Sequence, residues 1–225
     1  MLWRGLAMRL PFRFLFRALL LELLLCVSAV GDEWPSPQVR EVFSKARSYF
    51  VRVTPGQSWG DTYGFKGAAR GPYSKAEFFR QEKDQSYKLI ASAQLVNPVA
   101  PVDFFLTNRG YLVTLDNWHN RGYGKVVAFY SPNGLLIRAY ELSELFSKEE
   151  ISSFQRSVSS ILWRSGAAYV RPDQKTLDVA IDQKGRGFVF EVEGGSYQFC
   201  EWQGKDFRCR SSNEHRRWLP YREEQ

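Results

Sequence analysis

The sequence predicts a mainly β protein of antiparallel hairpins or a meander, propeller-blade-like or sandwich in arrangement, with two short helices. Aromatic residues make up 16% of the chain, and the Tyr, Phe and Val among its residues are types that strands favour. Apolar stretches of strand length follow one another between turn residues, and long helices do not alternate with them. A parallel α/β architecture is therefore disfavoured.

Residues 1–29 have the pattern of an export signal. Four arginines precede the apolar run ALLLELLLCV at 18–27, and Val-Ser-Ala at 27–29 supplies the small residues that a signal peptidase requires. The apolar run is shorter than the ~20 residues that span a bilayer. The sequence therefore predicts an exported protein, periplasmic or extracellular, with a single β-rich domain over 30–225.

Removal of this signal would leave 27 basic and 23 acidic residues, a net charge of about +4. For an exported protein, this excess gives no reason to expect a nucleic-acid partner. The predicted partner is an unknown protein or a small ligand, with membrane contact through the signal segment alone. Alternatives are a signal retained as an anchor, a lipoprotein attached through Cys26, and a start at Met8.

The cysteines Cys200 and Cys209 follow the signal, and export favours a disulfide between them. If Gly204-Lys205 is a two-residue type II′ turn, paired residues have numbers that sum to 409, and Cys200 faces Cys209 at a non-hydrogen-bonded pair. Cα atoms at such a pair lie ~4.5 Å apart, which a disulfide accepts. The same register places two favourable pairs opposite each other, Trp202–Phe207 and Glu201–Arg208. Two free thiols are the alternative.

The first part of the domain is predicted to begin with a helix and to continue in strands. Ser36-Pro37 fits an N-cap followed by the first helical residue, and apolar residues recur on one face between Val39 and Ala46. Strands are expected at 49–53 and 86–96. The glycine-rich segment 55–75 between them is predicted to be a long loop or short irregular strands.

Two hairpins are predicted next. The first turns at 108–110, and the second turns at Ser-Pro-Asn-Gly over 131–134, where Pro at i+1 and Gly at i+3 fit a type I turn with a G1 bulge. The strands at 111–115 and 126–130 are apolar on both faces. We therefore expect both strands to be covered on both sides.

The last third is predicted to contain one short helix and further hairpins. Ser147 and Glu150 are predicted to form a capping box at the start of this helix. Phe146 and Ile151, on either side of the box, are predicted to form a hydrophobic staple. Beyond this helix, strands separated by short turns are expected at three places: TLDVAID (176–182), GFVFEVE (187–193) and the cysteine hairpin.

The unit FFLTNRGYLVTLD…VVAFYSPNGLLIRAYEL resembles one four-stranded blade of the NHL-like propellers, in which hairpins with glycine in the turn recur. GFVFEVEGGSYQFCEW resembles such a blade more distantly, and the chain is also similar to exported bacterial β-rich proteins. The resemblance implies a propeller-blade-like domain. At ~40 residues per blade the chain holds four blades at most, so an incomplete propeller and a sandwich both stay open.

The loop LDNWHNRGYG at 115–124 is the candidate binding site, because loops on a rigid sheet often carry binding groups. The candidate binding residues are Asp116, Asn117, Trp118, His119 and Tyr123. In the structural alternative, Asp116 and Asn117 accept hydrogen bonds from backbone amides and Trp118 packs on the sheet edge.

The motifs assign no catalytic residue. Ser58 lies in a G-x-S-x-G match at 56–60, but glycine-rich sequence follows where an α/β-hydrolase requires a helix. His119 and His215 are too few for a three-histidine zinc site, and no phosphate-binding loop or dinucleotide fingerprint occurs. We therefore predict no catalytic set, no metal site and no cofactor.

The leading prediction is a non-enzymatic exported β-domain that binds a partner or a small ligand. One alternative is a periplasmic hydrolase that uses Ser58, or Asp116 with His119. Another is a structural envelope component whose basic segment 214–222 contacts a membrane; a solvated tail is the other interpretation of that segment.

Overall fold

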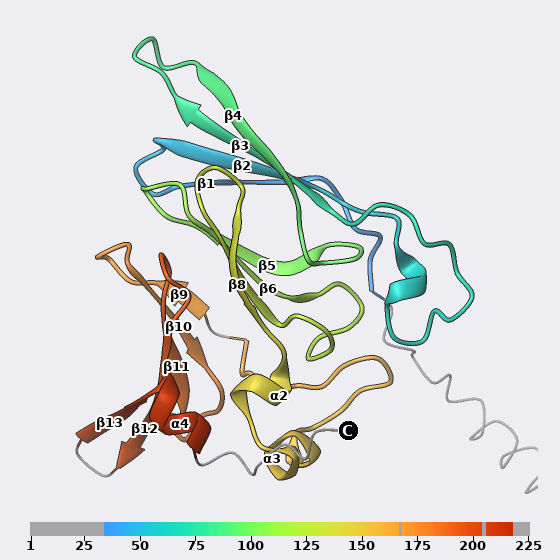
Figure 1. The fold of residues 1–225 in the computed structure, drawn as a ribbon, viewed down its shortest axis with the longest axis vertical. Helices are drawn as coiled ribbons and strands as arrows, with labels where there is room; N and C mark the ends of the chain where they lie inside the picture. The colour runs from blue at the N-terminus through green and yellow to red at the C-terminus, as the bar shows by residue number, and fades with distance from the viewer. Residues whose placement is uncertain (1–33, 167, 204–205, 218–225) are drawn as a thin grey trace, which may run out of the picture. The chain divides into compact units, whose positions relative to one another are not determined.

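The structure, a computed structural model, describes residues 34–166, 168–203 and 206–217. This part of the chain is mainly β, with three antiparallel sheets of four, four and five strands and a few short helices (Figure 1). The predicted fold class is therefore confirmed. The predicted signal at 1–29 and the turn residues at 204–205 lie outside the described residues. None of the described helices is long and apolar enough to cross a membrane.

The first sheet is a meander of four strands in chain order. Its strands are β1 (Arg40–Phe43), β2 (Tyr49–Thr54), β3 (Lys75–Gln81) and β4 (Tyr87–Gln94). The long connection between β2 and β3 contains the 3-10 turn η1 (Trp59–Asp61). The strands predicted at 49–53 and 86–96 are thus confirmed as β2 and β4, and the glycine-rich loop predicted at 55–75 is confirmed between β2 and β3; β3 itself was not predicted.

Strand β1 corrects the helix that the sequence predicted to begin at Ser36-Pro37. The segment pairs with β2, with Val42 opposite Val51 and Phe43 opposite Phe50. Val42 packs against the apolar core and the Phe43 ring lies 5.1 Å from the Phe50 ring. Cross-strand packing thus outweighs the helical spacing of a few apolar residues.

The second sheet contains the two predicted hairpins. Its strands are β5 (Pro101–Leu106), β6 (Leu112–Asn117), β7 (Val127–Tyr130) and β8 (Leu136–Tyr140). In the turn between β7 and β8, the Gly134 amide donates to the Ser131 carbonyl at 2.9 Å, and Gly134 has a φ of 76°. A residue with a side chain would be strained at this φ, which explains the glycine.

Every residue of β6 and β7 is buried, as predicted. Alternate residues of the two strands enter two different apolar clusters. Leu112 and Ala128 pack with the first sheet, whereas Val113 and Phe129 pack with the third sheet. The second sheet is therefore packed between the first and the third.

The third sheet has the strand order β13-β12-β11-β10-β9. Its strands are β9 (Ala168–Val170), β10 (Thr176–Ala180), β11 (Gly187–Glu191), β12 (Tyr197–Gln203) and β13 (Asp206–Ser211). The predicted register is confirmed, because Cys200 pairs with Cys209 and Gln203 with Asp206. The predicted disulfide Cys200–Cys209 is present, with the Cα atoms 4.0 Å apart.

Three short α-helices complete the described chain: α2 (Leu142–Leu145), α3 (Lys148–Ser153) and α4 (Ser212–Arg217). Helix α3 begins with the predicted capping box, in which the Ser147 side chain accepts from the Glu150 amide. Phe146 lies in the core, and Ile151 packs against the same cluster.

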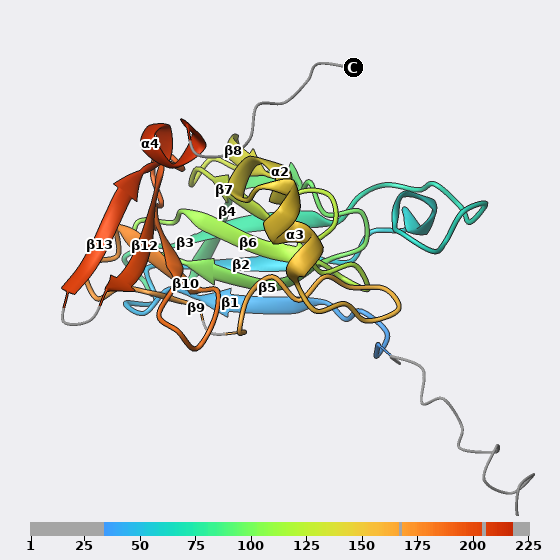
Figure 2. The ribbon, with the colours of Figure 1, turned by 90° about the horizontal axis from the view of Figure 1, so that it is seen from below.

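Each sheet is thus a meander of consecutive strands, and neighbouring sheets pack through their faces. In the view of Figure 2, from below, the strands of the first and second sheets overlap. Consecutive meanders packed in this way are the arrangement of propeller blades. The propeller-blade-like prediction therefore holds for the described part of the chain.

Candidate functional site

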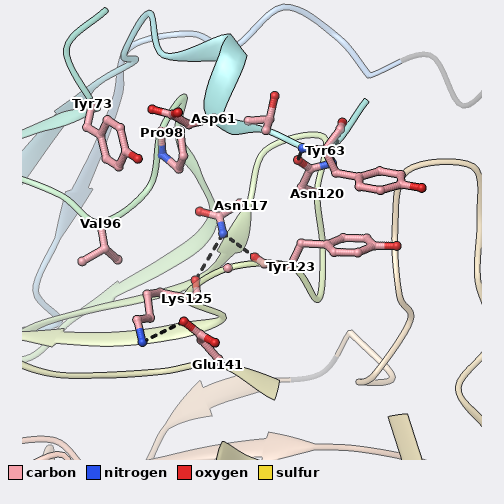
Figure 3. A pocket seen from close by; sticks show the side chains of 12 residues that line it. Asp61, Tyr63, Tyr73, Val96, Pro98, Asn117, Asn120, Tyr123, Lys125 and Glu141 are labelled. Atoms are coloured by element: carbon pink, nitrogen blue, oxygen red, sulfur yellow. Dashed lines mark hydrogen bonds and ion pairs between the residues drawn. The ribbon is translucent and has the colours of Figure 1, made fainter. Parts of the chain in front are cut away.

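A pocket of about 370 Å³ lies beside the predicted binding loop (Figure 3). Four segments that are distant in the sequence form its wall: the loop after β2, the segment after β4, the loop between β6 and β7, and the start of α2. The side chains that carry polar groups into the wall are Asp61, Tyr63, Tyr73, Asn117, Asn120, Tyr123, Lys125 and Glu141.

Asp61 is a carboxylate held by three neighbours. The Ser58 hydroxyl donates to it at 2.6 Å, the Arg70 guanidinium lies at 3.2 Å, and the Tyr73 hydroxyl forms a further hydrogen bond. The hydrogen bond from Ser58 is the main cause that lowers the pKa of Asp61, and Tyr73 and Arg70 act in the same direction against the effect of burial. Asp61 is therefore ionised at neutral pH.

Tyr73 is the hydroxyl partner of Asp61 in the pocket. Burial raises the pKa of this phenol, and the negative charge of Asp61 raises it further. Tyr73 therefore keeps its proton at neutral pH and can donate it in a hydrogen bond. Figure 3 shows the Tyr73 hydroxyl directed toward the space between Asp61 and Asn117.

Lys125 supplies a positive charge to the pocket. In the view of Figure 3, Asn117 lies between Lys125 and Asp61. Its Nζ atom lies 3.1 Å from the Glu141 carboxylate and 3.6 Å from that of Glu144. All three side chains are partly exposed, so a ligand in the pocket can reach the ammonium group. Among the described residues, no three His, Cys, Asp or Glu side chains gather in a way that would hold a metal ion.

The Asn117 amide holds the wall of the pocket in place. Its nitrogen donates to the Tyr123 carbonyl at 2.6 Å and to the Lys125 carbonyl at 3.3 Å, and its oxygen accepts from Asn97 at 2.8 Å. Asn117 therefore fixes the loop that carries Lys125.

The Asn120 amide connects that loop to the β2–β3 loop. Its oxygen accepts from the Tyr63 amide, and its nitrogen donates to the Tyr63 carbonyl at 3.3 Å and to the Ser159 carbonyl at 3.2 Å. The Tyr63 and Tyr123 rings stack with their centroids 4.8 Å apart. This stacked pair forms one side of the pocket.

The structure brings two of the five predicted binding residues, Asn117 and Tyr123, into the pocket wall. Asp116 is fully buried elsewhere: its carboxylate accepts from Trp163 and Arg164, each at 2.7 Å. The Trp118 indole donates to the Pro35 carbonyl at 3.1 Å.

The His119 ring lies among aromatic rings, with centroids 5.4 Å from that of Trp59 and 5.5 Å from those of Trp34 and Phe65. The Asp116 carboxylate also accepts from the Gly122 amide at 3.0 Å, as the structural alternative expects, whereas the Asn117 amide contacts the Tyr123 carbonyl and the Asn97 side chain instead. A binding role for the five residues stays a prediction.

Neither catalytic arrangement considered from the sequence has the geometry that its chemistry requires. Ser58 is buried, and its hydroxyl donates to Asp61 rather than to a histidine. Asp116 is fully buried, and its carboxylate accepts from Trp163 and Arg164, so a substrate cannot reach it as an acid or base beside His119.

Sequence reasoning missed Asp61, Tyr63, Tyr73, Lys125 and Glu141. The local sequence signal that could have identified Asp61 was its spacing from Ser58, because Ser and Asp side chains three residues apart can form a hydrogen bond across one turn.

No protein-family model and no curated relative matches the chain. In solved structures the chain is similar to a periplasmic gluconolactonase from Pseudomonas aeruginosa, with 14% identity and a TM-score of 0.40. It is also similar to putative 6-phosphogluconolactonases from Bacteroides fragilis and Bacteroides uniformis, with 10% and 8% identity and TM-scores of 0.36. The matches cover 80%, 76% and 76% of this chain and 57%, 55% and 55% of those chains, so the chain spans little more than half of their length.

These neighbours are named as lactonases, which are hydrolases. The comparison corrects the prediction of a non-enzymatic binding module and agrees better with the alternative of a periplasmic hydrolase. At this level of similarity, the neighbours' names assign no activity to this chain.

Proposed function

We propose that the protein is an exported hydrolase and that the pocket around Asp61 is its active site. The observation that carries the proposal is an ionised carboxylate, fixed by Ser58, Arg70 and Tyr73, in an open pocket that also contains the Lys125 ammonium group. Perturbed titratable groups in a concave pocket are a physical indication of an active site.

In the proposed reaction, a water molecule hydrogen-bonded to Asp61 attacks an acyl carbon. Asp61 orients the water and accepts its proton, while Lys125 stabilises the negative charge that develops on the acyl oxygen. The acyl C–O bond then breaks, and Asp61 passes the proton it took from water to the leaving alcohol oxygen, which yields a carboxylic acid and an alcohol and restores the carboxylate. Tyr73 positions the Asp61 carboxylate through its hydrogen bond.

The proposed substrates are small carboxylic esters, including cyclic ones. The volume of about 370 Å³ suits a ring-sized ligand, and the stacked pair of Tyr63 and Tyr123 offers it an aromatic side wall. Gluconolactone is the first probe, because it is the compound after which one structural neighbour is named.

Export is part of the proposal. The Cys200–Cys209 disulfide supports it, because disulfides persist in oxidising compartments such as the bacterial periplasm. The basic and apolar pattern of residues 1–29 supports it further.

The test is acid release from gluconolactone and from a panel of small linear and cyclic esters, followed by pH-stat and corrected for spontaneous hydrolysis. The protein is expected to hydrolyse at least one of them, and Asp61→Asn is expected to lower kcat/KM about 10²- to 10⁴-fold.

Asp84→Asn is the matched control, because Asp84 is also a carboxylate whose pKa is lowered by a hydrogen bond from a serine, Ser86, but it lies in the β3–β4 turn. The control is expected to keep its activity. Hydrolysis of no panel member contradicts the hydrolase. Equal rates for Asp61→Asn and the wild-type protein contradict the site.

A further inference from the structure

A second cavity, of about 350 Å³, lies on the outer face of the third sheet. Successive side chains of a strand point to opposite faces, and in β10 and β11 the side chains of Leu177 and Phe188 enter the core. Asp178 and Ala180 alternate with these core positions and line the cavity on the opposite face. The cavity shares no lining residue with the pocket around Asp61, so it is a separate site on the molecule.

The floor of this cavity consists of small residues. The strand register places Ala180 opposite Gly187 and Gly187 opposite Cys200. At Gly187 a Cβ atom would lie 2.9 Å from the Val179 carbonyl oxygen, so a side chain there requires the backbone to shift. The floor is therefore low and flat over three neighbouring strands.

A taller row of side chains forms one wall beside the floor. Asp178 is opposite Tyr169 on one neighbouring strand and opposite Val189 on the other, and all three residues line the cavity. Tyr169 is 56% exposed, so a ligand can reach its ring. An aromatic ring next to a flat floor suits a ring-shaped ligand that has an apolar face of its own.

Two arginine–aspartate pairs supply the polar groups of the cavity. The Arg171 Nε atom donates to Asp178 at 2.8 Å, and the Arg186 Nε atom donates to Asp182 at 2.7 Å. All four side chains line the cavity and are partly exposed. Each pair thus presents guanidinium donors and carboxylate acceptors side by side, and the two positive charges balance the two negative ones.

This polar pattern fits hydroxyl groups better than ions. A hydroxyl group both donates and accepts hydrogen bonds, so it can use both members of an arginine–aspartate pair. An ionic ligand would meet one attracting and one repelling charge at each pair. The cavity therefore favours a ligand that is neutral and carries several hydroxyl groups.

We propose that this cavity binds a neutral saccharide, either a monosaccharide or the terminal ring of a longer one. The apolar face of the sugar ring packs against Tyr169 and the floor, and its hydroxyl groups contact the Arg171–Asp178 and Arg186–Asp182 pairs. This binding site goes beyond the proposed hydrolase and does not depend on it, because the two cavities have no lining residue in common.

The test is a titration of the isotope-labelled protein with D-glucose, D-galactose, D-mannose and N-acetyl-D-glucosamine, followed by two-dimensional NMR. At least one sugar is expected to bind with a Kd of about 1 mM, the affinity that ordinary ligand efficiency gives a molecule of about a dozen non-hydrogen atoms. Because the ligand is neutral, the Kd is expected to stay the same from about 0.05 M to about 0.5 M sodium chloride.

Two tyrosine variants locate the site. Tyr169→Ala is expected to weaken binding about tenfold, because it removes the aromatic wall. Tyr63→Ala is the matched control: Tyr63 is 57% exposed, close to the 56% of Tyr169, but it lines the pocket around Asp61, so this variant is expected to keep the wild-type Kd. Ala180→Leu fills the floor and is expected to abolish binding. The NMR spectra of the free variants show whether each is folded.

Three results overturn the proposal. The first is that none of the four sugars binds. The second is a Kd that Tyr169→Ala leaves unchanged, and a loss in Tyr63→Ala alone would place the sugar in the pocket around Asp61 instead. The third is tighter, salt-dependent binding of glucuronate or glucosamine than of glucose, which would show that the cavity selects a charged ligand. Each result concerns binding, so it is independent of whether the protein hydrolyses esters.

Discussion

Asp116 lies near the end of β6, with its carboxylate fully buried between Trp163 and Arg164. The Arg164 guanidinium is itself 3% exposed and reaches a second carboxylate, Asp103, at 2.6 Å. Burial lowers the pKa of Arg164, and the two carboxylates outweigh that effect, so its pKa is raised. This network ties the segment after α3 to the second sheet.

Asp116→Asn is expected to lower the free energy of unfolding by about 3 kcal/mol or more, because it leaves a buried guanidinium with one carboxylate instead of two. The measurement is urea unfolding followed by tryptophan fluorescence. The matched control is Glu201→Gln, which removes one charge from the exposed pair with Arg210 and should cost about 1 kcal/mol or less. Equal losses in both variants would contradict the structural role assigned to Asp116.

At the residue scale, the loop predicted from the sequence contains both pocket-lining and core residues, which the sequence did not separate. Asn117 and Tyr123 line the pocket, whereas Asp116 serves the core. Residue type alone does not separate these uses, because an aspartate suits a binding site and a buried ion pair equally. The partner that decides the matter, Arg164, lies 48 residues away in the chain.

At the scale of elements, hairpins were predictable because their register depends on local turn chemistry. The cysteine hairpin has the predicted pairing along its whole length, including Trp202 with Phe207 and Glu201 with Arg208. The side chain of Glu201 nevertheless pairs with Arg210 at 3.0 Å, a diagonal neighbour.

Replacement of both Cys200 and Cys209 by alanine is expected to lower the free energy of unfolding by about 2–3 kcal/mol, because the cross-link closes a short loop of the unfolded chain. The measurement is thermal or urea unfolding of the double variant beside the oxidised wild-type protein. Reduction of the wild-type protein should give a loss of the same size. A loss below about 0.5 kcal/mol would mean that the disulfide contributes little to stability.

Several elements were not predicted from the sequence, among them the strands β1, β3 and β9. The segment Arg40–Phe43 has apolar residues at helical spacing but forms β1, because pairing with β2 buries them against the first sheet. Strand β9 has three residues, too few to show a period.

At the scale of the whole described chain, the pattern of apolar residues predicted single strands and hairpins, but it did not predict the packing of three sheets. The apolar runs at 111–115 and 126–130, which lie largely in β6 and β7, did indicate a sheet covered on both sides. The pocket required the tertiary structure, because Asp61, Tyr73, Lys125 and Glu141 meet only when the first two sheets have packed.

The dependence of kcat/KM on pH tests the central claim, that the Asp61 carboxylate and its Tyr73 partner form a hydrolytic site. The pKa of Asp61 is lowered and that of Tyr73 is raised, so Asp61 stays ionised and Tyr73 stays protonated across the neutral range. The account predicts constant kcat/KM from about pH 5 to about pH 9, with losses only below about pH 4 and above about pH 10. An acid limb centred near pH 6 to 7, where neither group titrates, would contradict it.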